Sequence, residues 1–137
     1  MRLLNVNGRL VFKNVSRFLI KWDRPSKSIL QYKVKQFLKP YWNGQVVYEE
    51  FPVYGTLLKV DIVNATLRIA VEVHGPQHSE FHWFHGGRPS EYLHSIQRDI
   101  KKMDWLAANN FTIAEIYHTE IDLLSKKFFL DKFKISL

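Results

Sequence analysis

Three strand-like segments follow one another between residues 45 and 73, and they constrain the fold more than any other part of the chain. They read QVVYEEF, TLLKVDIV and LRIAVEV, and each is rich in β-branched and aromatic residues. Pro52 closes the first, and turns at Tyr54-Gly55 and Asn64-Ala65 separate the others. Connections this short join antiparallel neighbours, so we predict three adjacent antiparallel strands.

A helix is predicted before the strands, in SKSILQYKVKQFL, where Ser26 or Ser28 can cap its start and Pro40 ends it. The apolar residues expected to be buried there are Ile29, Val34, Phe37 and Leu38.

A longer helix is predicted after residue 89, with Ser90 as its cap and Asn109-Asn110 as its stop. Its expected buried face steps by three and four residues through Leu93, Ile96, Ile100, Met103 and Ala107.

FTIAEIY then predicts a fourth strand, and TEIDLLSKKFFLDKF predicts a last helix that opens at Thr119. The order is α-β-β-β-α-β-α in a single domain of 137 residues. A helical crossover before the last strand favours a mixed four-stranded central sheet flanked by helices, an α/β fold.

The first 25 residues are basic, and their cations Arg9, Lys13, Arg17 and Lys21 recur every four positions. On a helix they would form one stripe, although Asn7-Gly8 could equally turn a hairpin. The whole chain carries a formal charge of +7, which favours a polyanionic partner such as nucleic acid.

The chain contains no cysteine, which excludes disulfides and thiolate metal sites. No apolar run is long enough for a transmembrane helix, and the first residues lack the apolar core of a signal peptide. We therefore expect a cytoplasmic protein with no membrane partner.

The stretch VEVHGPQH places two polar residues on one face of the third strand, because Glu72 and His74 are two positions apart. A buried carboxylate without a partner is strongly unfavourable, so this face meets either solvent or a cation. Asp61 in the second strand can reach the same place across the tight turn. Carboxylates with a backbone carbonyl suit Mg²⁺, which assists phosphodiester cleavage, and His74 can act as a base.

The pattern KVDIVNATLRIAVEVH resembles the signature of the PD-(D/E)XK nuclease superfamily, with His74 where lysine is usual. His74-Gly75 with His78, Arg98-Asp99 in a helix, and NNFTIAEIY are similar to the branch of very-short-patch repair and phage homing endonucleases. The resemblance spans roughly residues 26 to 122. It implies a restriction-endonuclease-like core there, after a basic extension (1–25) and before a C-terminal helix (123–137).

The resemblance also assigns roles to residues of the site. It implies that Asp61, Glu72 and the carbonyl of Val73 bind Mg²⁺, for which Mn²⁺ can substitute, and that His74 or His78 is the general base. Gln77 would orient water or phosphate. Asp99 would orient a histidine or, equally, pair with Arg98 or Lys102 for structural reasons.

The chain departs from the superfamily on the first helix, where Gln31 occupies the position that often holds glutamate. Glu49 or Glu50 could substitute for it from the neighbouring strand. The implied function is a Mg²⁺-dependent DNA endonuclease that nicks or cuts both strands. The alternative is a catalytically silent DNA-binding or assembly module with the same fold.

Four histidines between residues 74 and 85 allow a rival interpretation, a structural zinc site. Gly75-Pro76 prevents one helix from carrying His74, His78, His82 and His85, and cysteine is absent, so magnesium is favoured. The residues expected to contact DNA are Arg9, Lys13, Arg17, Lys21, Trp83, Arg88, Arg98 and Lys102.

Overall fold

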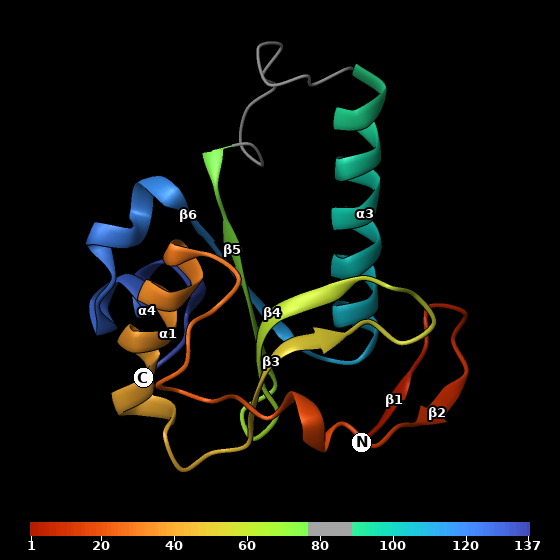
Figure 1. Ribbon diagram of the computed structural model, residues 1–137, viewed down its shortest axis with the longest axis horizontal. Coiled ribbons are helices and arrows are strands. Elements are labelled where there is room, and N and C mark those ends of the chain that lie inside the picture. The colour runs from red at the N-terminus through yellow and green to blue at the C-terminus, as the bar shows by residue number, and fades with distance from the viewer. Residues whose placement is uncertain (77–88) are drawn as a thin grey trace.

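The computed structural model describes residues 1–76 and 89–137. Its centre is a four-stranded mixed sheet in the order β3-β4-β5-β6 (Figure 1). The strands are β3 (Val47–Pro52), β4 (Lys59–Asn64), β5 (Ile69–His74) and β6 (Thr112–Tyr117). The first three are antiparallel neighbours, whereas β6 runs parallel to β5. The predicted α/β class and mixed sheet are confirmed.

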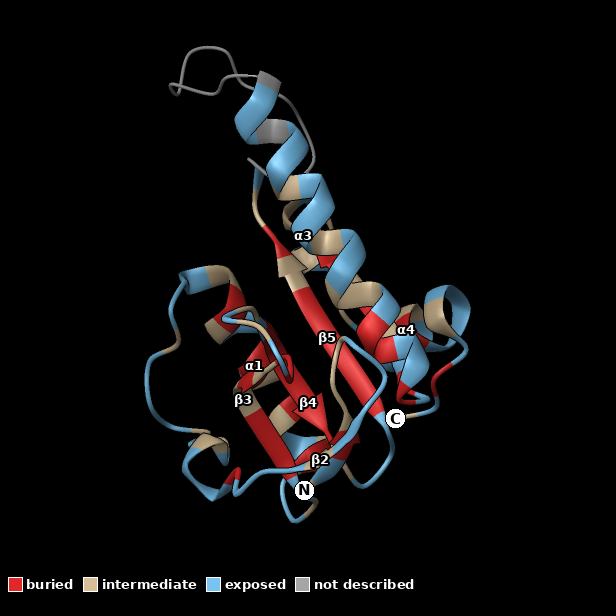
Figure 2. Cartoon of the chain, turned by 90° about the vertical axis from the view of Figure 1, so that its right-hand side faces the viewer, coloured by how far each residue is buried: buried red, intermediate tan, exposed pale blue. Residues whose placement is uncertain are grey.

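Helices cover both faces of the sheet (Figure 1). The helices α1 (Ile29–Trp42) and α4 (Lys126–Phe133) pack on one face, where Val34, Leu38 and Phe129 are buried with Ile62 and Val71. The helix α3 (Pro89–Ala108) covers the other face through a second cluster, which includes Trp105, Leu106, Phe51, Val63 and Ala70. The strands between these layers are therefore buried on both sides (Figure 2).

The N-terminal residues form a hairpin, so the helix suggested by the basic stripe is wrong. Strand β1 (Arg2–Leu4) pairs with β2 (Leu10–Phe12), and the 3-10 helix η1 (Ser16–Phe18) follows. The Asn5 side chain accepts hydrogen bonds from the N–H groups of Asn7 and Arg9, and Gly8 adopts a φ of 81°. This turn chemistry overrides the four-residue spacing, as the Asn7-Gly8 alternative predicted.

Helix α1 begins as expected, because the Ser28 side chain accepts a hydrogen bond from Gln31 N. It does not end at Pro40 but continues to Trp42, since a proline in the last turn removes only one helical donor. Val34 and Leu38 are buried as predicted, whereas Ile29 is 76% exposed. The helix contacts the sheet through positions four residues apart, and Ile29 lies in the first turn, outside that row.

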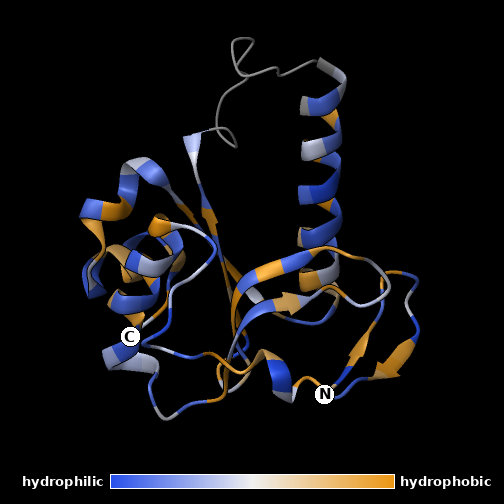
Figure 3. Ribbon diagram, in the orientation of Figure 1, coloured by the Kyte–Doolittle hydropathy of each residue, from blue (hydrophilic) through white to orange (hydrophobic). Residues whose placement is uncertain are grey.

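The expected buried face of α3 is wrong over much of its length. Leu93, Ile96 and Ile100 are 56%, 37% and 53% exposed, because α3 extends beyond the sheet and only its C-terminal turns pack (Figure 2). Polar residues dominate the extended part (Figure 3). The helix starts at Pro89 rather than after Ser90. Its stop is confirmed, since Asn110 has the left-handed φ of 63°.

The C-terminal segment forms two helices instead of the one predicted from Thr119. The 3-10 helix η3 (His118–Leu123) comes first, and α4 begins after Ser125, whose side chain accepts a hydrogen bond from Phe128 N. The N-capping serine interrupts the amphipathic pattern and starts a new helix. Among the helices that the structure describes, none combines the length and apolar character needed to span a lipid bilayer.

Candidate functional site

Asp61 and Glu72 meet where strands β4 and β5 separate. The ladder between the two strands runs from Asn64 opposite Ile69 to Ile62 opposite Val71. One residue further on, Val73 N donates a 2.7 Å hydrogen bond to Asp61 Oδ2, and Asp61 N donates a 3.4 Å hydrogen bond to Glu72 Oε2. Each carboxylate thus satisfies a backbone donor of the other strand. The tight turn brings the two acids together, and each is only 2% exposed.

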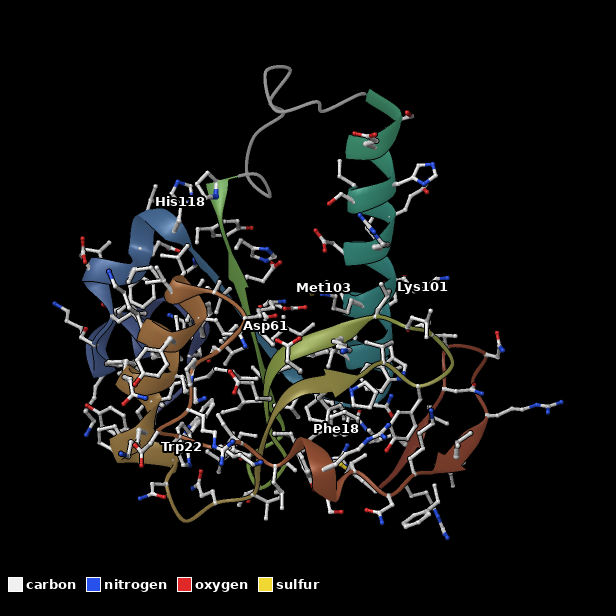
Figure 4. The ribbon with its side chains drawn as sticks, viewed as in Figure 1. Phe18, Trp22, Asp61, Lys101, Met103 and His118 are labelled. Atoms are coloured by element: carbon white, nitrogen blue, oxygen red, sulfur yellow. The ribbon has the colours of Figure 1, made fainter. Side chains whose placement is uncertain are left out.

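Two lysines from different elements neutralise this pair of acids. Lys27 precedes α1, and its Nζ lies 2.7 Å from Asp61 Oδ1 and 3.8 Å from Glu50 Oε1. Lys102 of α3 approaches from the other face, with its Nζ 2.7 Å from Glu72 Oε1. Asp61 lies between the strands and the segment that precedes α1 (Figure 4). We call Glu50, Asp61, Glu72, Lys27 and Lys102 the acid–lysine cluster.

Burial controls the protonation of the cluster. Burial, followed by the negative charge of Asp61, raises the pKa of Glu72 from 4.5 to about 8, and Lys102 only partly opposes this shift. Burial alone would lower the pKa of Lys27, but the charges of Asp61, Glu50 and Glu72 outweigh it, and the net pKa is raised. Two carboxylates this close therefore need either a proton or cations near them.

Helix α1 supports the cluster with fully buried polar side chains. Gln31 Nε2 donates to Glu49 Oε2 at 2.9 Å and to Glu50 Oε1 at 3.1 Å. Lys35 Nζ donates to Glu49 Oε1 at 2.9 Å and to the carbonyl of Arg24 at 2.7 Å. Gln31 and Lys35 are both 0% exposed. Of the two glutamates that the sequence left open, Glu50 is the one that shares Lys27 with Asp61, while Glu49 is bound by Lys35.

His74 has a carboxylate partner that was not predicted. Its Nε2 lies 3.1 Å from Glu115 Oε1, and its ring stacks on Tyr117 at 5.0 Å between centroids. The parallel register of β5 and β6 causes this, because it sets Glu72 beside Glu115 and His74 beside Tyr117. The hydrogen bond from His74 is the main reason that the pKa of Glu115 is lowered.

Asp99 of α3 lies near the same end of β6. The pKa of Tyr117 is raised by burial first and then by the charges of Glu115, Glu120 and Asp99. The charge of Asp99 therefore acts on Tyr117, the ring on which His74 stacks. The remaining predicted catalytic residues, Gln77 and His78, lie outside the described residues.

The donor set suits a hard divalent cation only in part. Within residues 1–76 and 89–137, no three His, Asp or Glu side chains converge closely enough to hold a metal ion on their own. The buried pair Asp61 and Glu72 nevertheless offers carboxylate oxygens that already attract cations, and Val73 follows Glu72 directly. Such oxygen donors, completed by water, are those that Mg²⁺ accepts. The zinc alternative rests on His78, His82 and His85, which fall outside the described residues.

The residues expected to bind DNA occupy separate places. Arg9 lies in the turn of the hairpin, and Lys13 Nζ lies 5.2 Å from the centroid of the Tyr54 ring. Arg17 stacks over Phe18 at 4.7 Å, and Lys21 follows in the next segment. Arg98 lines a small hollow beside the β3–β4 connection.

Lys102 belongs to the acid–lysine cluster, with only 15% of its side chain exposed. Trp83 and Arg88 lie outside the described residues.

Sequence reasoning missed three side chains at or beside the cluster, namely Lys27, Lys35 and Glu115. Lys27 and Lys35 occur in a segment that contains several lysines, and nothing in their spacing distinguishes them. Glu115 could have been found from the register of a parallel β5–β6 pair, which a sequence alone does not supply. Comparison of the chain with models of known families, with curated proteins and with solved structures finds no match.

Proposed function

We propose that this protein is a metal-dependent DNA endonuclease with a restriction-endonuclease-like core. The observation that carries the proposal is the burial of Asp61 and Glu72 side by side, on adjacent strands, with a lysine against each. Without a function, such an arrangement is costly, because two desolvated carboxylates repel each other. Perturbed carboxyl groups of this kind are concentrated at functional sites. The resemblance of KVDIVNATLRIAVEVH to the nuclease signature supports the same assignment.

Asp61, Glu72 and the carbonyl of Val73 would hold Mg²⁺ or Mn²⁺. When bound, the ion would neutralise charge on the phosphate and make water more acidic. Lys27 lies between Asp61 and Glu50, so its ammonium would have to move aside for the ion. Lys102 would stay against Glu72 and limit the negative charge of the site.

His74 is the proposed base, with His78 as the alternative from the sequence. A base that removes a proton from water becomes positively charged. Glu115, at 3.1 Å from His74 Nε2, would stabilise the imidazolium and fix the orientation of the ring. Hydrolysis would then add water across a P–O bond of the DNA backbone.

The test compares Asp61→Asn and Glu72→Gln with the parent protein in plasmid cleavage with Mg²⁺, Mn²⁺ or EDTA. Both variants keep an oxygen that can accept the backbone hydrogen bonds and lose only the charge. We expect cleavage to fall by at least about 10²-fold, the scale of losing one key electrostatic group. Lys59→Gln is the matched control, because Lys59 is an exposed residue of β4. Undiminished cleavage by either acid variant would overturn the site.

A second candidate, a catalytically silent DNA-binding module, is favoured by one observation. Lys27 and Lys102 already pair with Asp61 and Glu72, so each of these two acids has a cation without a metal. Such a module would retard DNA in a gel equally with Mg²⁺ and with EDTA, and it would cut no substrate. An active nuclease would cut DNA, and EDTA would stop it.

A further inference from the structure

The segment before α1 is fixed in place by three side chains of that helix. Lys35 Nζ donates to the carbonyl of Arg24 at 2.7 Å, and Gln36 Nε2 donates to the carbonyl of Trp22 at 2.6 Å. Lys39 Nζ lies 2.6 Å from Asp23 Oδ1. Helix α1 thereby holds three consecutive residues, 22 to 24, so the position of this segment is fixed relative to the helix. Figure 4 labels Trp22, the first residue of this segment, and Phe18, which precedes it in the chain.

This segment borders a cleft of about 300 Å³ that includes Glu50 of the acid–lysine cluster. The cleft is lined by Arg17, Phe18, Leu19, Lys21, Arg24, Pro25, Glu49 and Glu50. Glu50 is one of these lining residues, and it shares Lys27 with Asp61. Lys27 therefore links Glu50, a lining residue of the cleft, to Asp61 of the proposed metal site.

The cationic charges in the cleft have no ion-pair partners among residues 1–76 and 89–137. Arg17, Lys21 and Arg24 are exposed, and none of them forms an ion pair with a carboxylate of residues 1–76 or 89–137. The two glutamates are already engaged, because Lys35 and Gln31 bind Glu49, and Gln31 and Lys27 bind Glu50. Three cations without a carboxylate partner in the described residues thus line the cleft beside acids that have partners.

We propose that the cleft formed by Arg17, Lys21 and Arg24 binds the phosphate backbone of DNA and guides one strand to Asp61 and Glu72. Arginine and lysine neutralise the phosphates of a DNA strand, and these contacts position the strand on the protein. The hydrogen bonds from α1 fix residues 22 to 24 before DNA binds, and stacking on Phe18 orients the Arg17 guanidinium. The inference deepens the proposed function and rests on it for the cleavage of the bound strand at Asp61 and Glu72.

This assignment divides the basic stripe that the sequence suggested. Arg17 and Lys21 belong to the cleft together with Arg24, which was not predicted. Arg9 lies in the hairpin and Lys13 directly follows β2, and neither lines the cleft. The hairpin therefore supplies a control surface of similar charge.

The experiment measures binding of a fluorescent DNA duplex in EDTA by anisotropy, over a series of salt concentrations. The cleft variant is R17Q/K21Q/R24Q, and the control is R2Q/R9Q/K13Q, which removes the same charge from the hairpin. We expect the cleft variant to bind more weakly and its salt slope to fall by roughly 0.9 for each phosphate that it no longer neutralises. The control should keep a slope close to that of the parent.

Equal weakening in the two variants would overturn the proposal, because net charge alone would then explain binding. An unchanged slope in the cleft variant would overturn it as well. Thermal unfolding of each variant checks the fold, and the single variants R17Q and R24Q provide the test if the triple variant is unstable. Because binding is measured without metal, its result is independent of the cleavage assay on Asp61→Asn. If the cleft variant binds DNA like the parent while the parent shows metal-dependent cleavage, the cleft proposal is rejected and the proposed nuclease function stands.

Discussion

The Glu72–Lys102 and Asp61–Lys27 pairs have the same separation of 2.7 Å but lie in different surroundings. Lys102 is 15% exposed and belongs to a helix, whereas Lys27 is 54% exposed and belongs to the segment before α1. Both acids are equally buried. The distance within an ion pair therefore does not by itself determine its contribution to stability, because solvent screens Lys27 far more than Lys102.

The surroundings also decide which lysine can move. Lys27 borders an open cavity of about 510 Å³ between the segment before α1 and the start of that helix. Its ammonium has space to leave the acids without disturbing the core. Lys102 lies one turn before Trp105 and Leu106, which anchor α3 in the core. We therefore expect Lys102 to act as a structural cation and Lys27 as an exchangeable one.

The largest effect is expected from Lys102→Met. At pH 9, where Glu72 of the parent is ionised, the variant removes the cation of a buried carboxylate, and the free energy of unfolding should fall by up to about 3–5 kcal/mol. At pH 6 the loss should be smaller, because Glu72 then carries a proton. Chemical denaturation at the two pH values measures both. A loss that is equal at pH 6 and pH 9 would contradict the role of Glu72.

The second effect is a decline of stability with rising pH in EDTA. The folded protein holds the Glu72 proton up to a pKa of about 8, whereas the unfolded chain releases it near 4.5. Between these values the folded state binds more protons, so the free energy of unfolding falls as pH rises, on the order of 3 kcal/mol between pH 5 and 8. Glu72→Gln should show a flatter profile. Parallel profiles for the two proteins would refute this cause.

The sheet could be predicted from the sequence because its strands are short, apolar and separated by clear turns. The Asp61–Glu72 contact followed from the same logic, since adjacent strands joined by a tight turn place both residues near one point. Periodicity failed on α3, where Leu93, Ile96 and Ile100 have helical spacing but no sheet beneath them. Spacing identifies an apolar face, but it cannot say how far the neighbouring layer extends.

The cations of the site could not be predicted, because they come from outside the strands. Lys27 and Lys102 are far apart in sequence and approach the acids from opposite faces of the sheet. Glu115 meets His74 only through the register of β5 and β6. Each contact depends on tertiary placement, which no local pattern in this chain encodes.

The third effect is stabilisation by Mg²⁺. An ion that binds only the folded protein should raise the free energy of unfolding by about 1.4 kcal/mol at ten times its dissociation constant. Thermal unfolding in a Mg²⁺ series at pH 8 measures this gain. Asp61→Asn and Glu72→Gln should lose it, while Lys59→Gln keeps it. A gain that persists in both acid variants would place the ion elsewhere.

The smallest effect on stability, and the sharpest contrast with Lys102, is expected from Lys27→Met. In EDTA the change should cost less than about 1 kcal/mol, because the lysine is half exposed and screened by water. Mg²⁺ should nevertheless bind several-fold more tightly, since no ammonium competes for Asp61. Titration of the parent and the variant with Mg²⁺, followed by calorimetry, gives both affinities, and Lys33→Met provides an α1 lysine outside the cluster as control. Weaker Mg²⁺ binding by Lys27→Met would show that this lysine organises the acids instead of occupying the place of the ion.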